Sequence, residues 1–280
     1  MALSVVDLYR DILPRTNCKD CGFSTCLAFA GFVVSEKHAI DGCPHLLPEV
    51  VKRCNEELAA QSAAGKWTKR DLAEDALKWA KERSASMALQ DLPDRIGGAL
   101  IKAAGMPDVL TLPYYTDILH ITEADITTAS GALLTRWERV FLYNHMAQGG
   151  KRHPTGNLKG FEAFPNTVSK IKTMTGQVEA PLAEHFGRDP EALKAAAARL
   201  GGVDITGKDN NADLAFGFRP LPRIPVMVLF WNADVADGFA ATAKLLFDET
   251  IIEHLDIESI VFLSERLRQM LCGESNDEKG

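Results

Sequence analysis

The chain of 280 residues is 46% hydrophobic and 25% charged, and it carries a formal net charge of -7. Such a composition is typical of a soluble globular protein, and we favour a small module followed by a larger domain. The acidic balance, with no stripe of Lys and Arg, argues against nucleic acid binding, because such proteins replace phosphate counterions with basic side chains. The apolar run Val226 to Trp231 is far shorter than the roughly 20 residues of a membrane-spanning helix, so we expect no membrane span.

The first residues, Met1 to Asp7, lack the basic and then apolar pattern of a secretory signal. We therefore expect a cytoplasmic protein with reduced thiols. Of the six cysteines, four lie between residues 18 and 43, and only Cys54 and Cys272 stand apart. This crowding indicates a metal site rather than a secreted disulfide scaffold. The other two cysteines are expected to be small buried hydrophobic residues.

The first part of the chain predicts a compact helical module, which we place at residues 1–62. Apolar residues spaced by three and four predict a short helix over residues 4–13, ended by the following proline. The apolar string from Thr25 to about Lys37 predicts a buried helix with a hydroxyl side chain as its cap. A further helix is predicted from Pro48 to Ala60.

A small and polar stretch at residues 60–66 is the predicted linker to a second domain, residues 67–272. A helix is predicted near Lys69 to Arg83 in that domain. Two short strands follow, Val109 to Pro113 and Asp117 to Ile126, the second with partial alternation of apolar and polar residues.

The rest of the second domain alternates between helical and strand patterns. A helix is predicted from Leu133 to Met146, and another begins at Asp189-Pro190, where an Asp cap and a first-turn proline are typical of a helix start. A buried strand is predicted from Val226 to Trp231. Two helices are expected after it, at residues 238–247 and 256–271.

The predicted fold class is therefore α+β or α/β, with a small helical module followed by a larger mixed α and β domain. The charged segment at residues 273–280 is expected to be a disordered tail. We find no internal repeat.

The four clustered cysteines have the spacing C-x2-C-x4-C-x16-C and are Cys18, Cys21, Cys26 and Cys43. Short loops let successive sulfurs converge on one centre, and Gly22 can take the positive φ that such a loop often needs. A cysteine near a helix amino terminus gains from the helix dipole, which favours the thiolate. Four thiolates suit a structural zinc site as well as a [4Fe-4S] cluster. The spacing, together with Pro44 directly after the last cysteine as in bacterial ferredoxins, favours iron.

The stretch L-P-R-T-N-C-K-D-C-G-F-S-T-C, with the later C-P-H-L, resembles the [4Fe-4S] domain of two families. These are the large subunit of the corrinoid iron–sulfur protein of acetyl-CoA metabolism and the B subunit of Rnf-type electron-transport complexes. The resemblance covers about residues 10–47 and implies that the four cysteines are the cluster ligands of an electron-transfer module. Lys19-Asp20 departs from relatives that commonly have Gly at the first of these positions, and we expect it to alter the charge of the loop more than ligation.

From about Leu110 onward the chain resembles an uncharacterised domain of strict anaerobes that is often fused behind this cluster domain and has no known reaction. The residues that carry the resemblance are 156–166, 181–187, 213–234 and 245–259.

A second cofactor or substrate site is a further candidate in this domain, at Trp231, Asp234 and Asp237. These residues follow a predicted strand and could line a crevice together with Asp248 and Glu249. The alternative is that the two aspartates only turn the chain and cap a helix. Relatives are often more acidic after this Trp-x-x-Asp. This chain instead has Val235 and Ala236 between its two aspartates, which argues against cation binding here.

Two histidines are further candidates for a binding site. His145 and His153 flank a Gly149-Gly150 loop that could hold an anion or supply an axial ligand to a tetrapyrrole, although exposed loop polarity explains them as well. His120 falls in a strand pattern and is expected to be a core histidine.

We expect the protein to be a low-potential electron carrier that serves a redox partner, and by resemblance a corrinoid protein or a one-carbon enzyme. The first alternative is a redox enzyme whose second domain binds a substrate or tetrapyrrole and takes electrons from the cluster. The second alternative is a structural or oxygen-sensing protein in which the metal centre only stabilises the first module.

Overall fold

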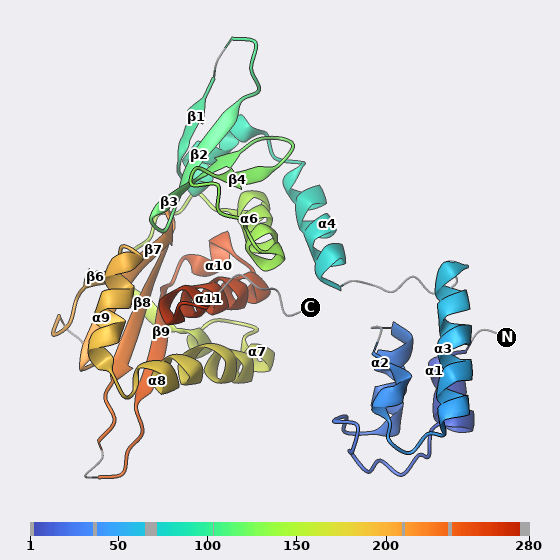
Figure 1. Ribbon diagram of the computed structural model, residues 1–280. Coiled ribbons are helices and arrows are strands. Elements are labelled where there is room, and N and C mark those ends of the chain that lie inside the picture. The colour runs from blue at the N-terminus through green and yellow to red at the C-terminus, as the bar shows by residue number, and fades with distance from the viewer. Residues whose placement is uncertain are drawn as a thin grey trace. The chain divides into compact units, whose positions relative to one another are not determined.

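The computed structural model describes residues 3–35, 38–64, 72–102, 104–208, 211–234 and 237–274. The chain divides into two compact units, residues 1–75 and 76–280, which we call the N-terminal and C-terminal units (Figure 1). Each unit is described by itself. Of the predicted tail, residues 273 and 274 are described, and residues 275–280 lie outside the described residues.

The predicted linker at residues 60–66 begins inside a helix, because α3 (Pro48–Ala63) is longer than its sequence pattern suggests. Residues 65–71 lie outside the described residues. The domain limits 1–62 and 67–272 stay a prediction.

The N-terminal unit begins with α1 (Val5–Asp7), which continues into the π-helical turn η1 (Leu8–Ile12). Ser4 caps α1, since its hydroxyl oxygen accepts the backbone N–H of Asp7 and the Asp7 carboxylate accepts the N–H of Ser4. This reciprocal pairing satisfies two donors that a helix start otherwise leaves open. The predicted short helix is thus confirmed.

Two more helical segments complete this unit, α2 (Cys26–Ser35) and the 3₁₀ turn η2 (Ile40–Gly42), which lead to α3 (Figure 1). Almost every residue of α2 is apolar, as expected for a helix that is buried on most sides. The core of the unit consists of Leu8, Leu13, Phe29, Ala30, Val33, Val34 and Ile40 together with Cys26, Cys43 and Cys54. Three cysteines therefore belong to the hydrophobic core itself.

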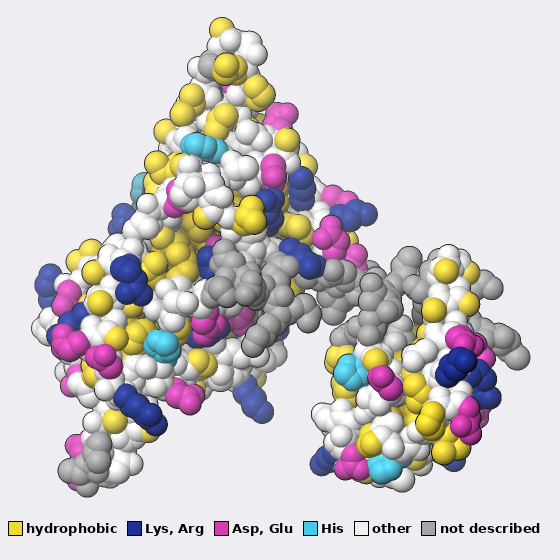
Figure 2. Space-filling model, viewed as in Figure 1, with side chains coloured by type: hydrophobic (Ala, Val, Ile, Leu, Met, Phe, Trp, Pro, Cys, Tyr) yellow, Lys and Arg dark blue, Asp and Glu magenta, His cyan; other side chains and the backbone are white. Residues whose placement is uncertain are grey.

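The C-terminal unit contains two antiparallel sheets. The first has the order β1-β2-β3-β4. Its strands are β1 (Ala99–Ile101), β2 (Val109–Tyr114), β3 (Asp117–Ile121) and β4 (Ile126–Thr128). One face of it is buried, whereas the other carries exposed Ile101 and Ile118. Hydrophobic side chains are visible on the surface over this sheet in Figure 2.

The second sheet has the order β5-β9-β8-β7-β6, and all of its neighbouring strands are also antiparallel. Its strands are β5 (Leu158–Gly160), β6 (Val203–Asp204), β7 (Leu214–Leu221), β8 (Ile224–Trp231) and β9 (Thr242–Asp248). Antiparallel sheets combined with separate helices make this an α+β fold, which resolves the choice that the sequence left open.

Helices cover these sheets, and α11 (Ile257–Cys272) packs against α6 (Arg136–Gln148), α7 (Val168–Met174) and α8 (Ala180–Phe186) (Figure 1). The remaining helical segments are α4 (Leu72–Ser84), η3 (Leu89–Asp91), α5 (Leu92–Ile96), η4 (Phe161–Ala163), η5 (Thr175–Glu179), α9 (Pro190–Arg199) and α10 (Ile251–His254). Within the described ranges, none of the helices is long and apolar enough to cross a membrane.

Two sequence predictions in this unit were wrong. The helix expected at residues 238–247 is largely strand β9, which pairs with β8 from Trp231 opposite Thr242 to Val226 opposite Phe247. Local helix propensity yields there to the backbone hydrogen bonds and apolar contacts that the neighbouring strand offers. The strand expected from Asp117 to Ile126 is split, because a turn at Thr122 to Asp125 separates β3 from β4.

A charged cluster holds α6 and α11 together inside this unit. The Glu138 side chain is almost fully buried, and its Oε1 accepts hydrogen bonds from the hydroxyl of Tyr114 at 2.8 Å and from Nε of Arg266 at 2.9 Å. Its other oxygen, Oε2, accepts the backbone N–H of Thr135 at 2.8 Å. Because both carboxylate oxygens accept hydrogen bonds and one of them pairs with Arg266, the cost of burying this carboxylate is offset by its partners.

Candidate metal centre

The four clustered cysteines lie on three consecutive segments of the N-terminal unit. Cys18 and Cys21 belong to the loop between η1 and α2, Cys26 is the first residue of α2, and Cys43 directly follows η2. The side chain of Cys18 is exposed, that of Cys21 is half-buried, and the other two are buried. The set therefore runs from the solvent into the core.

The four thiols lie near one another. Burial is the main cause that raises the pKa of Cys43, and the neighbouring thiols of Cys21, Cys26 and Cys18 raise it further. The backbone N–H of His45 acts in the opposite direction. Since like charges disfavour ionisation, this effect places the other three clustered thiols in the neighbourhood of Cys43.

The loop before α2 has an unusual backbone. Arg15, Asn17 and Lys19 have φ values of 57°, 50° and 70°, and Gly22 has a φ of 82°. Positive φ is uncommon for residues with a side chain, and such conformations concentrate at functional sites. The predicted role of Gly22 in this loop is consistent with its conformation.

Two side chains fasten this loop to the start of α2. Oδ1 of Asn17 accepts the backbone N–H of Cys26 at 2.8 Å, and Oγ1 of Thr25 accepts the N–H of Ala28 at 3.0 Å. Thr25 thus provides the hydroxyl cap that the sequence predicts for this helix.

An ion pair closes the exposed side of the set. Nε2 of His45 lies 2.7 Å from Oδ2 of Asp20, and the ligand atoms of Cys18, Asp20 and His45 all lie within 4.8 Å of one another. The hydrogen bond from His45, followed by that from Cys18, lowers the pKa of Asp20. Sequence reasoning missed this pair, although His45 follows the Cys-Pro dipeptide directly.

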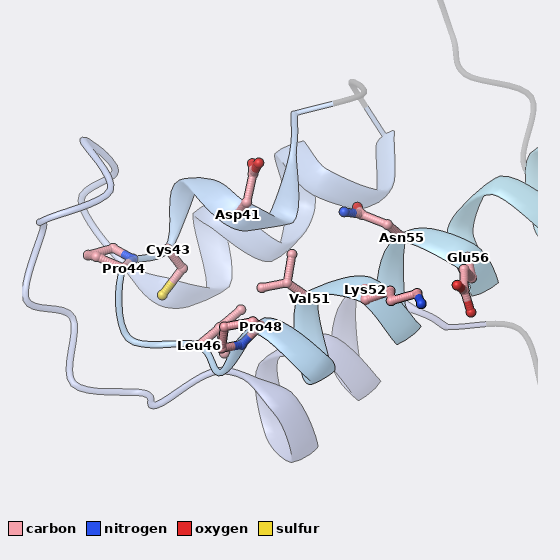
Figure 3. A pocket seen from close by; sticks show the side chains of 9 residues that line it. All are labelled: Asp41, Cys43, Pro44, Leu46, Pro48, Val51, Lys52, Asn55 and Glu56. Atoms are coloured by element: carbon pink, nitrogen blue, oxygen red, sulfur yellow. The ribbon is translucent and has the colours of Figure 1, made fainter.

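An open groove of about 580 Å³ adjoins the last cysteine (Figure 3). Apolar side chains of Pro44, Leu46, Pro48 and Val51 line it together with Cys43. Polar residues, Asp41, Lys52, Asn55 and Glu56, lie around them. One wall of the cysteine set is thus apolar.

The residues present fit an iron–sulfur group. Thiolate sulfurs are the ligands that both iron–sulfur clusters and structural zinc prefer, and three of the four thiols lie at least partly inside an apolar core. The donor set alone accepts either metal. The role of the four cysteines as ligands stays a prediction.

The second candidate site, in the C-terminal unit, lies on an exposed turn. Trp231 ends β8, and its indole N–H donates to the backbone oxygen of Asn211 at 2.9 Å. Oδ1 of Asp234 accepts the N–H of Asp237 at 3.1 Å, and both aspartates are exposed. Both aspartates thus lie between the paired strands β8 and β9, where Asp234 accepts a local backbone N–H.

The residues expected to complete that crevice lie elsewhere. Asp248 is at the far end of β9 from Thr242, the partner of Trp231, which corresponds to roughly 20 Å along a strand. It is buried and accepts hydrogen bonds from the backbone of Gly156 and Thr250. The crevice was expected at the end of a strand in an α/β sheet, and the strands on both sides of β8 are antiparallel to it.

The histidines are placed differently from one another. His145 is buried, and its Nδ1 lies 3.2 Å from the backbone oxygen of His254. The centroids of the two imidazole rings are 5.5 Å apart. His153 lies exposed beside the guanidinium of Arg223. His120 is exposed on β3, so its expected place in the core was wrong. Because His145 is buried, exposed loop polarity does not explain a histidine at this position.

Acid should destabilise the C-terminal unit through His145. Burial, followed by the neighbouring His254, lowers the pKa of His145 from 6.5 to about 3. Between these values the unfolded chain binds the proton and the folded chain does not, so stability is full above the upper value and falls with decreasing pH by up to about 1.4 kcal/mol per pH unit. Urea unfolding followed by tryptophan fluorescence at several pH values should show this slope.

His145→Gln should flatten that pH dependence, whatever its effect on stability at neutral pH. His120→Gln, at an exposed position, is the matched control and should keep the slope. An equal slope in the wild type and the His145 variant would contradict the assignment.

Comparison with known sequences identifies two segments. Residues 13–45 match the family profile described as "Putative Fe-S cluster", and residues 88–270 match the profile described as "Domain of unknown function (DUF3786)". All four clustered cysteines lie in the first segment. No solved structure matches the chain.

The curated relatives match a short part of this chain, 20% of it or less. The acetyl-CoA decarbonylase/synthase complex subunit gamma of Methanocaldococcus jannaschii is 46% identical over 44 residues, which is 16% of this chain and 9% of the relative. The corrinoid/iron-sulfur protein large subunit of Moorella thermoacetica is 44% identical over 46 residues, 16% of this chain and 10% of the relative. The subunit gamma of Methanopyrus kandleri is 39% identical over 57 residues, 20% of this chain and 12% of the relative.

The chain thus spans about a tenth of the length of these relatives, and the likeness is confined to the cysteine-bearing segment. The resemblance of that segment to the corrinoid iron–sulfur proteins is confirmed. In this chain the segment that matches the iron–sulfur profile precedes the one that matches the second profile. Because the second profile covers more than half of the chain, the protein belongs to the family described as domain of unknown function DUF3786.

Proposed function

We propose that this protein is a [4Fe-4S] electron carrier that delivers single low-potential electrons to a protein partner. The observation that carries the proposal is the gathering of Cys18, Cys21, Cys26 and Cys43 in the segment that matches an iron–sulfur family. Cys-Pro at the last position favours iron over zinc, as in ferredoxins.

The four cysteines would hold the cluster through their thiolates. When bound, a [4Fe-4S] cluster supplies one-electron transfer at low potential. Buried Cys26 and Cys43 fix one side of the site in the core and exclude water there, while exposed Cys18 leaves one edge open to the solvent. An open edge suits electron exchange with another protein, because tunnelling requires a short distance.

A corrinoid protein of one-carbon metabolism is the partner class that we propose. The support is the likeness of the cysteine segment to the corrinoid/iron-sulfur protein large subunit. Since that likeness covers only the segment, the partner is inferred from the electron-transfer module and not from the C-terminal unit.

Anaerobic purification followed by metal analysis tests the proposal most directly. We expect about four iron and four sulfide per chain, and a broad visible absorbance that dithionite bleaches. Zinc in place of iron, or iron that dithionite cannot reduce, would contradict it.

Electron delivery needs a separate measurement. The dithionite-reduced protein, freed of excess reductant, should reduce a cob(II)alamin-containing corrinoid protein, seen as the cob(I)alamin absorbance. The protein reconstituted with zinc is the matched control. Equal rates with and without the iron-loaded protein would exclude this partner class.

A further inference from the structure

The Asp20–His45 ion pair joins two segments that each carry predicted ligands. Asp20 lies between Cys18 and Cys21 in the first loop, whereas His45 lies two residues after Cys43. Their side chains meet at 2.7 Å although they are 25 residues apart in sequence. The pair thus connects the beginning of the cysteine set to its end.

The pair also lies at the exposed side of the set. The side chains of His45 and Asp20 are 46% and 51% exposed, and Cys18, the exposed thiol, lies within 4.8 Å of both. Buried Cys26 and Cys43 are held by the core, but Cys18 has no such support. A ligand on an exposed loop depends on local contacts for its position.

We infer that Asp20 and His45 are positioning residues for the cluster: their hydrogen bond fastens the Cys18 loop to the Cys43 segment and slows loss of the cluster at its exposed edge. This inference rests on the proposed function, and it identifies two residues that support the same site. Supporting contacts of this kind fix ligand orientation around metals, and their loss lowers retention.

The carboxylate of Asp20 has a second effect that follows from its charge. A negative charge beside Cys18 disfavours addition of an electron, so removing it should make the reduction potential more positive. His45→Gln leaves the carboxylate in place, so it should not move the potential in the positive direction as Asp20→Asn does. A contact that served only to hold the loop would not produce this difference.

Cluster loss in the full-length, iron-loaded protein tests the inference. The visible absorbance is followed during anaerobic incubation with a ferrous chelator for the wild type, Asp20→Asn, His45→Gln and the double variant. Exposed ion pairs are weak, so each single variant should lose the cluster about two- to fivefold faster. Because both act through one contact, the double variant should be no faster than the faster single variant.

Asp11→Asn is the matched control, since Asp11 pairs with neighbouring Arg10 and does not join the two cysteine segments. It should keep the wild-type rate. Asp20→Glu should restore part of the retention, and thermal unfolding of the metal-free variants reveals any general loss of folding.

Wild-type loss rates in Asp20→Asn and His45→Gln would overturn the inference while the proposed function stands. Strictly multiplicative effects in the double variant would overturn it as well. A wild-type protein that takes up no iron would instead refute the proposed function.

Discussion

Cys43→Ser should remove the iron–sulfur chromophore from the protein. Cys43 is 5% exposed and lies among the other three thiols, so a solvent molecule cannot readily replace its sulfur. Loss of a supporting residue alone costs roughly 10- to 100-fold in metal affinity, and loss of a ligand should cost more. Iron content and visible absorbance after anaerobic purification measure the effect.

Cys54→Ala is the matched control because Cys54 is 1% exposed in the same core but lies outside the four-cysteine set. It should lose only a small amount of folding free energy and keep its iron. Iron retained in the Cys43 variant, or lost in the Cys54 variant, would show that the ligand set is wrong.

Glu138→Gln should strongly destabilise the C-terminal unit. An amide at this position cannot neutralise Arg266, which then stays largely buried without a counter-charge. Breaking a buried ion pair from one side costs about 3–5 kcal/mol in free energy of unfolding. Urea unfolding at pH 7, followed by tryptophan fluorescence, should show this loss.

Glu162→Gln makes the same chemical change in the exposed ion pair with Lys244. It should cost about 1 kcal/mol or less. Arg266→Met combined with Glu138→Gln should recover part of the lost stability, because no buried charge remains. Equal losses for Glu138 and Glu162 would contradict the assigned difference in burial.

The sequence was informative where local chemistry decides the structure. Asp189 caps α9 and Pro190 begins it, as predicted, because its carboxylate accepts the N–H of Ala192. Strand β9 was missed because Ala241 to Phe247 contain good helix formers, and only pairing with β8 places them in a sheet. Long-range pairing is not visible in a local pattern.

The candidate site shows the same contrast between local signals, which the sequence reveals, and long-range contacts, which it does not. The cysteine spacing is a local signal, and the structure gathers those four thiols. The contact between Asp20 and His45 depends on how η2 returns the chain toward the first loop, which no short pattern encodes. The crevice at Trp231 was expected at the end of a strand in an α/β sheet, whereas β8 and β9 pair there antiparallel.

Cys26 and Cys43 belong to the same buried core as Leu8, Phe29 and Ile40. A unit of this size has a small apolar core, so a metal held by core residues would add to its stability. Loading with iron and sulfide would then be linked to folding by mass action. Iron supply in the cell would set how long each newly made chain survives proteolysis, so the abundance of the protein would follow cluster assembly as well as gene expression.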